Sequence, residues 1–199
     1  MPGLQFTPAS PVLRRDPFDH TDYIFELKHD GFRALAYIDH HCTQLFSRRG
    51  NVYRSFPRLC VSIRGELKYE AVLDGEIVCL DSEGQPQFYE LLRRRGQPVF
   101  YVFDLLWLDG EDLRERPLIE RKRLLRSIVP EKSSSLLYAD HIEQHGVEFF
   151  RLACDRDLEG VVGKWRYGGY GQSWWKIRNP AYSQYEGRHE LFEKRAAVR

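Results

Sequence analysis

Short runs of β-branched and aromatic residues constrain the fold of this chain more than any other feature. Such runs occupy 23–28, 32–38, 42–48, 71–80, 98–108, 158–165 and 173–178. They are rich in Val, Ile, Phe, Tyr and Trp and are separated by Asp-Gly and other glycine-containing turns, which is typical of strands. Helical patterns occupy 87–95, 117–129 and 143–154. Because strands outnumber helices and do not alternate strictly with them, we expect an α+β fold with two mainly antiparallel sheets flanked by helices.

The second helical segment has the clearest periodicity. Pro117 suits a first helical position, and an apolar stripe follows that comprises Leu118, Leu125 and Ile128. For the third segment we expect burial of the apolar residues Val147, Phe150 and Leu152 or Ala153. The segment 131–135 between them is a polar loop.

The composition limits the class of protein but does not identify a binding partner. Charged residues make up 30% of the chain and hydrophobic residues 42%, which excludes a disordered polyelectrolyte, and the net charge of +1 leaves only a local basic face for nucleic acid. The four cysteines form no C-x-x-C pair, and His40, His41 and Cys42 lack the second cluster that a zinc site requires. No apolar run approaches the roughly 20 residues of a membrane span. We therefore expect a cytoplasmic monomer with no membrane contact.

The segment 26–33, ELKHDGFR, concentrates charge around a turn. Side chains alternate along a strand, so Glu26 and Lys28 share one face. Asp30 and Gly31 form a tight turn, and Arg33 lies on the returning strand. We therefore expect these charged groups at one end of a hairpin. Taken alone, the segment is also compatible with a solvated amphipathic hairpin.

Other strand segments carry similar chemistry. They are SRRG at 47–50, LDGEIV at 73–78, YVFDLL at 101–106, LEGVVGK at 158–164 and SWWKIR at 173–178. In the last of these, Lys176 and Arg178 point to the same side because they are two residues apart. Each segment alone reads as a strand with a turn. Their joint presence in this order favours a shared functional site over a set of unrelated strands and turns.

In this order the segments resemble the motifs of the covalent nucleotidyltransferases, which include ATP-dependent DNA ligases, RNA ligases and mRNA capping enzymes. KHDGFR is similar to the nucleophile motif K-x-D-G-x-R, and SRRG, DGE, YVFD, EGVVGK and WWKIR look like the motifs that follow it. The resemblance covers about 26–178. The S-R-x-G and W-x-K-I-R elements are closest to bacterial and archaeal DNA ligases, including the end-joining type, which implies transfer of adenylate rather than guanylate.

The resemblance implies an ATP pocket between the two sheets, with Lys28 as the nucleophile. Lys28 would attack the α-phosphate of ATP, form lysyl-AMP, pass AMP to the 5′-phosphate of nicked double-stranded DNA and support nick sealing in repair. A lysine amine attacks only when neutral. We expect Arg33, Lys164, Lys176 and a bound Mg²⁺ to disfavour the ammonium and to stabilise the charge of the transferring phosphate.

The resemblance also implies roles at the base and the ribose. Glu26 would face the adenine edge, and Phe103 would stack on the ring. A valine, Val161 or Val162, would cover the other face of the ring. The ribose hydroxyls would be held by Glu76 and Arg33. Phe103 is equally well explained as a core residue, because aromatic side chains in hydrophobic strands usually belong to the core.

Further implied roles concern the phosphates and the metal. Lys176 would contact the α-phosphate, Lys164 would add positive charge, and Arg48 would lie near the ribose or the DNA ends. Glu159 would coordinate Mg²⁺ or Mn²⁺, and its neighbours in this role would be Asp30, Glu76 or Asp104. The sequence departs from the motifs at His29, where an aromatic is common, at Arg49, where asparagine is common, and in 168–173, which lacks an arginine found in some ligases.

We expect a single adenylation domain over 1–199, with an N-terminal arm at 1–22 and a C-terminal wrap ending in a short helix at 179–199. About 21 residues follow Arg178, too few for an oligonucleotide-binding barrel. A separate barrel-domain or end-joining repair protein is therefore an expected partner. A basic face would contact DNA, formed by Arg48, Arg49, Arg54 and Arg58 with 93–95. The alternatives are an RNA ligase, a capping-type nucleotidyltransferase and an inactive nucleotide-binding repair module.

Overall fold

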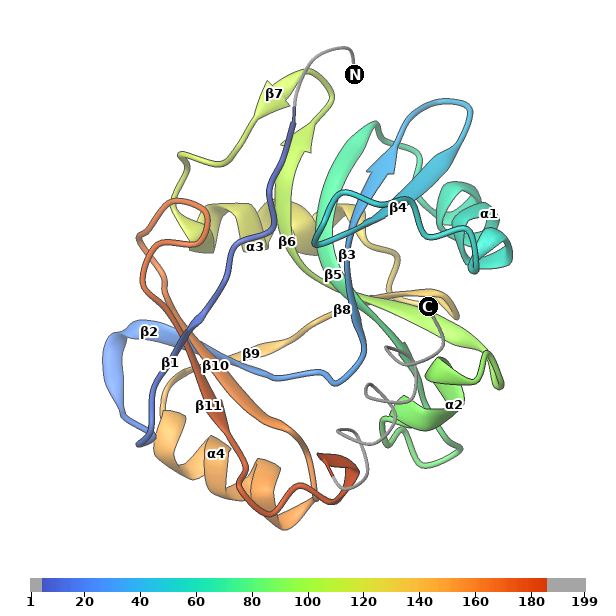
Figure 1. Cartoon of the computed structure of the whole chain (residues 1–199). Coiled ribbons are helices and arrows are strands. Elements are labelled where there is room, and N and C mark those ends of the chain that lie inside the picture. Colours follow the sequence, from blue (N-terminus) through green and yellow to red (C-terminus); the bar gives the residue numbers. More distant parts are fainter. Residues whose placement is uncertain (1–4, 186–199) are drawn as a thin grey trace.

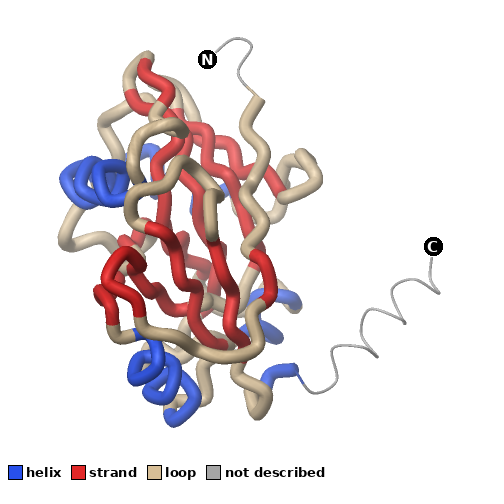
Figure 2. The backbone as a smooth tube through the Cα atoms, turned by 90° about the vertical axis from the view of Figure 1, so that its left-hand side faces the viewer, coloured by secondary structure: helices blue, strands red, loops and turns tan. Residues whose placement is uncertain are grey.

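The computed structural model describes residues 5–185, which form two β-sheets with helices on their outer sides (Figure 1, Figure 2). Sheet A has five strands in the order β1-β11-β10-β2-β9. Their bounds are β1 Val12–Leu13, β2 His20–Leu27, β9 His141–Gln144, β10 Gly160–Trp165 and β11 Trp174–Arg178. Sheet A therefore combines strands from the two ends of the described chain.

Sheet B is built from the middle of the chain. It has six strands, five of them in the order β4-β3-β5-β6-β7, and β8 pairs with β6. Their bounds are β3 Phe32–Ile38, β4 Thr43–Ser47, β5 Ala71–Cys79, β6 Pro98–Leu108, β7 Glu111–Asp112 and β8 Leu136–Tyr138. Among the strands of residues 5–185, only the pairs β1 with β11 and β6 with β8 are parallel. The predicted α+β class with two mainly antiparallel sheets is confirmed.

The helices cover the outer faces of the sheets. They are α1 Pro57–Glu66, α2 Phe88–Leu92, α3 Leu118–Ile128 and α4 Gly146–Asp155, followed by the 3-10 turn η1 Ser183–Tyr185. The main hydrophobic core lies in sheet B, where Ile63 of α1 and Leu125 of α3 are fully buried beside Leu73 and Phe100. A smaller cluster joins α4 to sheet A through Ala153, Val161 and Ile177. None of the helices within 5–185 has the length and apolar character needed to cross a bilayer.

The predicted hairpin at Asp30 and Gly31 is wrong. The strand before this turn, β2, pairs with β9 and β10 in sheet A, whereas β3 pairs with β4 and β5 in sheet B. Residues 28–31 therefore cross from one sheet to the other. Gly31 passes so close to β5 that a Cβ at this position would collide with the carbonyl oxygen of Ile77. Glycine is therefore needed at this position because the chain passes close to β5 as it crosses between the sheets.

The helices differ from expectation at their ends. The first predicted helix ends at Leu92, because the backbone turns left-handed at Arg94 and Gly96, with φ of 59° and 73°. The start of the third is strand β9, which pairs with β2, so α4 begins only at Gly146. Val147 and Leu152 are exposed rather than buried, while Ala153 is buried as predicted. Helix α1 and strands β1, β7, β8 and β9 were not predicted. The short helix expected after 185 lies outside the described residues.

Candidate active site

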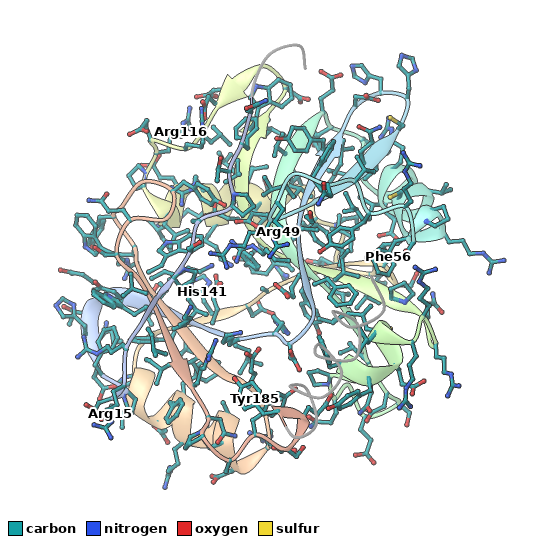
Figure 3. The ribbon with its side chains drawn as sticks, viewed as in Figure 1. Arg15, Arg49, Phe56, Arg116, His141 and Tyr185 are labelled. Atoms are coloured by element: carbon teal, nitrogen blue, oxygen red, sulfur yellow. The ribbon has the colours of Figure 1, made fainter. Side chains whose placement is uncertain are left out.

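One cavity lies between the two sheets, with a volume of about 240 Å³. Figure 3 shows side chains from both sheets filling the space between their ribbons. The cavity lining comprises Ala9, Ser10 and Pro11 of the N-terminal arm, Glu26, Leu27, Val162, Lys164, Trp174, Lys176 and Arg178 of sheet A, Lys28 and His29 of the crossover, and Arg33, Arg48, Glu76 and Phe103 from sheet B and the loop after β4. A second cavity of about 540 Å³, lined mainly by 126–142, lacks this concentration of charge.

Most of the residues predicted for the site lie on this wall. They are Glu26, Lys28, Arg33, Arg48, Glu76, Phe103, Lys164 and Lys176. Val161 does not, and its assignment to the pocket is wrong. It is fully buried on the opposite face of β10, where it packs with Ala153 and Ile177. Because neighbouring strand residues point to opposite faces, Val162 is the valine that lines the cavity.

Lys28 is paired with Glu159. The Lys28 Nζ lies 2.6 Å from Glu159 Oε1, and the side chains are 21% and 6% exposed. Tyr185, labelled in Figure 3, donates its hydroxyl to the same Oε1 at 3.0 Å. The other carboxylate oxygen, Oε2, is buried and has no hydrogen-bond partner within residues 5–185. Glu159 thus holds the lysine with one oxygen and keeps a second available for another ligand.

Of the four carboxylates predicted for the metal, Glu159 and Asp30 lie close enough to Glu76 to affect its charge. Burial, with Glu159 and Asp30, raises the pKa of Glu76 to about 8, against the opposing effect of Arg33 and Lys28. Asp30 accepts a hydrogen bond from the Tyr182 hydroxyl at 2.9 Å. No group of three or more His, Cys, Asp or Glu side chains in the described part of the chain is placed to hold a metal together. The available oxygen of Glu159 is the feature that fits a divalent cation, which prefers oxygen ligands.

Asp104 belongs to the interior and not to this acidic group. The side chains of Asp104 and Arg121 are both completely buried, and the guanidinium donates to the two carboxylate oxygens at 2.8 and 2.9 Å. Phe103 lines the cavity, whereas Asp104 is not part of its wall. The expectation that Asp104 assists a metal is wrong.

Arg33 is fixed by a partner that the sequence analysis did not single out. Its guanidinium donates to both oxygens of Asp74 at 2.6 Å each and lies 4.4 Å from the centroid of the Phe103 ring. The Tyr170 hydroxyl donates to Asp74 and accepts from the backbone N–H of Ala9 at 2.9 Å. This network ties the N-terminal arm to the cavity. Strand alternation from Glu76 was the signal that could have identified Asp74.

One end of the cavity is rich in cations. Burial and the nearby charges of Arg178, Lys28 and Arg48 lower the pKa of Lys176. Arg48 also donates to Ser10 Oγ at 2.7 Å. Lys176 and Arg178 share the cavity side of β11, as predicted. We call Lys28, Arg48, Lys176 and Arg178 the phosphate end, because a polyphosphate would neutralise their charge.

The other end is buried, and its carboxylate is paired with two ammonium groups. Glu26 is 2% exposed and accepts hydrogen bonds from Lys122 Nζ at 2.7 Å and from Lys164 Nζ. Lys164 Nζ lies 4.3 Å from the ring centroids of Phe103 and Trp174. His29 stacks on Tyr101 at 4.0 Å, and burial lowers its pKa to about 4, so the ring is neutral at pH 7. We call Glu26, Lys122 and Lys164 the base end. Neither Lys122 nor Trp174 was predicted for the site.

Comparison with known proteins identifies the family of this site. The model of the ATP dependent DNA ligase domain matches residues 11–178. The SPbeta prophage-derived DNA ligase-like protein LigB of Bacillus subtilis is 30% identical, and the match covers 88% of this chain and 69% of LigB. The DNA ligase of Thermococcus fumicolans is 30% identical over 77% of this chain and 32% of its own length. The end-joining protein LigD of Mycobacterium tuberculosis is 34% identical over 75% of this chain and 20% of its own length.

Solved structures give the same result. A mycobacterial DNA ligase D, described as complexed with ATP and MES, superimposes with a TM-score of 0.74 at 29% identity, over 86% of this chain and 60% of that one. The Chlorella virus DNA ligase-adenylate, at 16% identity and a TM-score of 0.64, shares the fold over 87% of this chain and 69% of its own. The chain therefore spans 69% of LigB but a third or less of the other two relatives named here. On the match to the family model and to LigB, this chain belongs to the ATP-dependent DNA ligase family.

Proposed function

We propose that this domain transfers AMP from ATP to the 5′-phosphate of nicked DNA through a covalent intermediate on Lys28. The observation that carries the proposal is the place of the Lys28 amine. It lies on the cavity wall at the phosphate end, 2.6 Å from Glu159 Oε1. Lys28, Lys164 and Lys176 are the lysines that line this cavity, and only Lys28 lies on the crossover between the sheets.

In the first step the Lys28 Nζ attacks the α-phosphorus of ATP. The N–P bond forms, the bond from the α-phosphorus to the bridging oxygen breaks, pyrophosphate leaves, and the proton of the amine passes to solvent. An ammonium held against a carboxylate has no lone pair for attack, so the pair with Glu159 must open. A divalent cation bound to Glu159 would compete for that carboxylate and add positive charge beside the α-phosphate. Lys176 stabilises the same charge.

In the second step an oxygen of the DNA 5′-phosphate attacks the α-phosphorus of lysyl-AMP. The N–P bond breaks, a phosphoanhydride forms between AMP and the DNA end, and the lysine is regenerated. Attack by the neighbouring 3′-hydroxyl on the DNA 5′-phosphorus then seals the nick and releases AMP. The duplex would be held by four exposed arginines, of which Arg48 lines the cavity and Arg49, Arg54 and Arg58 follow it in the chain; such contacts give strongly salt-dependent binding. A barrel-domain or end-joining protein would add further contacts.

The base end supports adenylate rather than guanylate transfer. Glu26 accepts from the amino group of adenine, while Phe103, and Val162 in place of Val161, enclose the ring. Glu76 and Arg33 hold the ribose hydroxyls. A nicked DNA duplex is the proposed substrate, because the relatives named above are DNA ligases.

The test is incubation with ATP and Mg²⁺ followed by mass spectrometry of the intact protein. We expect one adenylate adduct on the wild-type protein and none on Lys28→Ala, because the other two cavity lysines lie at different places on the wall. Lys68→Ala, at an exposed position outside the cavity, is the matched control and should retain the adduct. An adduct that persists in Lys28→Ala contradicts the assignment of the nucleophile. Comparison of nicked DNA with nicked RNA then separates the substrates.

A further inference from the structure

Lys122 is a buried lysine that the proposed chemistry does not use. It lies in the middle of α3, and its side chain is 1% exposed. Its Nζ donates to Glu26 Oε1 and to the carbonyl oxygen of Ala139, each at 2.7 Å, and lies 4.3 Å from the centroid of the Tyr138 ring. A fully buried ammonium is costly unless every N–H finds a partner. Here the partners include an acidic residue of the cavity.

Lys122 reaches the cavity wall by its hydrogen bond to Glu26. Lys122 is not part of the cavity wall, whereas Glu26 is. Its neighbour Arg121 is equally buried but pairs with Asp104, which is not part of the cavity wall. Arg121 and Lys122 are adjacent in α3 but have different roles. The pair of Arg121 stabilises the interior, and the pair of Lys122 fixes a group that faces the ligand.

The contact with Lys122 determines the form in which Glu26 meets a ligand. Burial raises the pKa of Glu26, but the charges and hydrogen bonds of Lys122 and Lys164 outweigh burial and lower it overall. Glu26 is therefore an ionised carboxylate that accepts hydrogen bonds and cannot donate them. Lys122 occupies Oε1 and Lys164 occupies Oε2, which fixes the orientation of the carboxylate.

We propose that Lys122 is a positioning residue for purine selectivity, which holds Glu26 as a fixed, charged acceptor for an exocyclic amino group. The inference rests on the proposed function, in which Glu26 faces the base. Adenine presents a donor at its 6-position, which such a carboxylate accepts. A 6-oxopurine presents an acceptor there, so two acceptors would face each other in a dry site. Without Lys122 the carboxyl can rotate or take up a proton, and the protonated form can donate to a 6-oxo group.

The experiment compares covalent nucleotide attachment from ATP and from ITP, which carries a 6-oxo group. Lys122→Met keeps the length of the side chain and removes its charge and donors. We expect the ratio of kcat/KM for ATP to that for ITP to fall about tenfold or more, the equivalent of one misplaced hydrogen bond to a charged group. Arg126→Met is the matched control, since this exposed cation lies over the same Tyr138 ring, at 5.0 Å, without a contact to Glu26. Its ratio should equal that of the wild type.

The outcomes separate the inference from the proposed function. Absence of an adenylate adduct on the wild type contradicts the proposed function. An adduct with equal losses for both nucleotides in Lys122→Met shows that Lys122 only stabilises the fold and overturns the inference, as does a wild type that accepts both nucleotides equally. If Lys122→Met does not fold, Lys122→Gln is measured instead, because its amide can still donate to Ala139. A lowered ratio in Lys122→Gln supports the inference, and an unchanged ratio overturns it.

Discussion

The two ends of the cavity differ in how their charges are balanced. At the base end, Glu26 and Lys164 are 2% exposed and Lys122 is 1% exposed, and the carboxylate lies between the two ammonium groups. At the phosphate end, Lys176 is half-buried, Arg48 and Arg178 are exposed, and Lys28 is 21% exposed. Glu159 is the acidic partner of Lys28 there. The charged groups of the base end are paired with one another without a ligand. The phosphate end has more cations than acidic partners.

This difference shows how one cavity can combine recognition with catalysis. A preorganised base end loses little entropy when the ring enters, so it can discriminate between bases. The excess cations of the phosphate end repel one another until a polyphosphate neutralises them, so that end gains most from the transferring group. The following predictions test this division, in order of decreasing expected effect.

Asp104→Asn tests the ion pair between Asp104 and Arg121, which is buried outside the cavity. It leaves the Arg121 guanidinium buried without its counter-ion, and we expect a loss of about 3 kcal/mol in the free energy of unfolding, measured by urea denaturation. Arg178→Ala, at the exposed end, should change it by less than about 0.5 kcal/mol. The Mg²⁺ dependence of adenylation should be unchanged in Asp104→Asn. A shifted dependence would return Asp104 to the metal site.

Glu159→Gln tests the phosphate end. The neutral amide is a weaker ligand than the carboxylate, so we expect adenylation at limiting Mg²⁺ to fall about 10- to 100-fold and to recover partly at saturating Mg²⁺. Titration of the rate with Mg²⁺ measures this shift. Tyr185→Phe is the control, since it removes the hydrogen bond to Oε1, keeps the Glu159 carboxylate and should leave the metal dependence nearly unchanged. An identical titration curve for Glu159→Gln would limit Glu159 to its ion pair with Lys28.

Phe103 tests whether the base end binds a ring or only packs against its neighbours. We expect Phe103→Ala to weaken ATP binding about tenfold through lost stacking, while Phe103→Trp retains the affinity. Isothermal titration gives the affinity and thermal melting gives the stability. If all substitutions lower the melting temperature and leave ATP affinity unchanged, Phe103 serves only the cluster that it forms with Ala139 and Trp174.

Glu76 gives an effect of a different kind, on the pH dependence of stability. Its pKa in the fold is about 8, above the ordinary 4.5, so between these values the folded protein retains a proton that the unfolded chain has lost. This contribution to stability is present below pH 4.5 and is lost as the pH rises towards 8. We therefore expect Glu76→Gln to flatten the decline in melting temperature between pH 5 and pH 8. An unchanged decline would show that Glu76 is already ionised in this range.

Strand alternation predicted much of this site from sequence. It placed Glu26 with Lys28 and Lys176 with Arg178 on shared faces, and each of these side chains lines the cavity. The same rule could not choose between Val161 and Val162, because the direction of the core depends on α4, whose start was also misplaced. Strand alternation follows from the local sequence. Which face of a strand is buried depends on the element that packs against it, and that element can be distant in sequence.

The errors arise where distant segments meet. The residues of 26–33 fit a hairpin equally well, and only the pairing of β2 with β9 and β10 separates the two strands. Lys122 lies on the apolar stripe of α3 with Leu118 and Leu125, at helical spacing. That position was a usable signal of burial. Its partner Glu26, 96 residues away, could not be identified from spacing.

The strand composition of the two sheets has a consequence for the order of folding. Sheet B uses a continuous stretch, 32–138, whereas β2 finds its partners only in β9 and β10, more than 110 residues later. Contacts between residues so far apart in sequence have a high entropic cost of loop closure. We therefore expect β2 to remain unpaired during synthesis until sheet B has formed. We expect the last step of folding to join the two ends of the described chain and to form the cavity. Substitutions in β10 or β11 that slow this step should expose an unpaired hydrophobic strand and promote aggregation before they affect turnover.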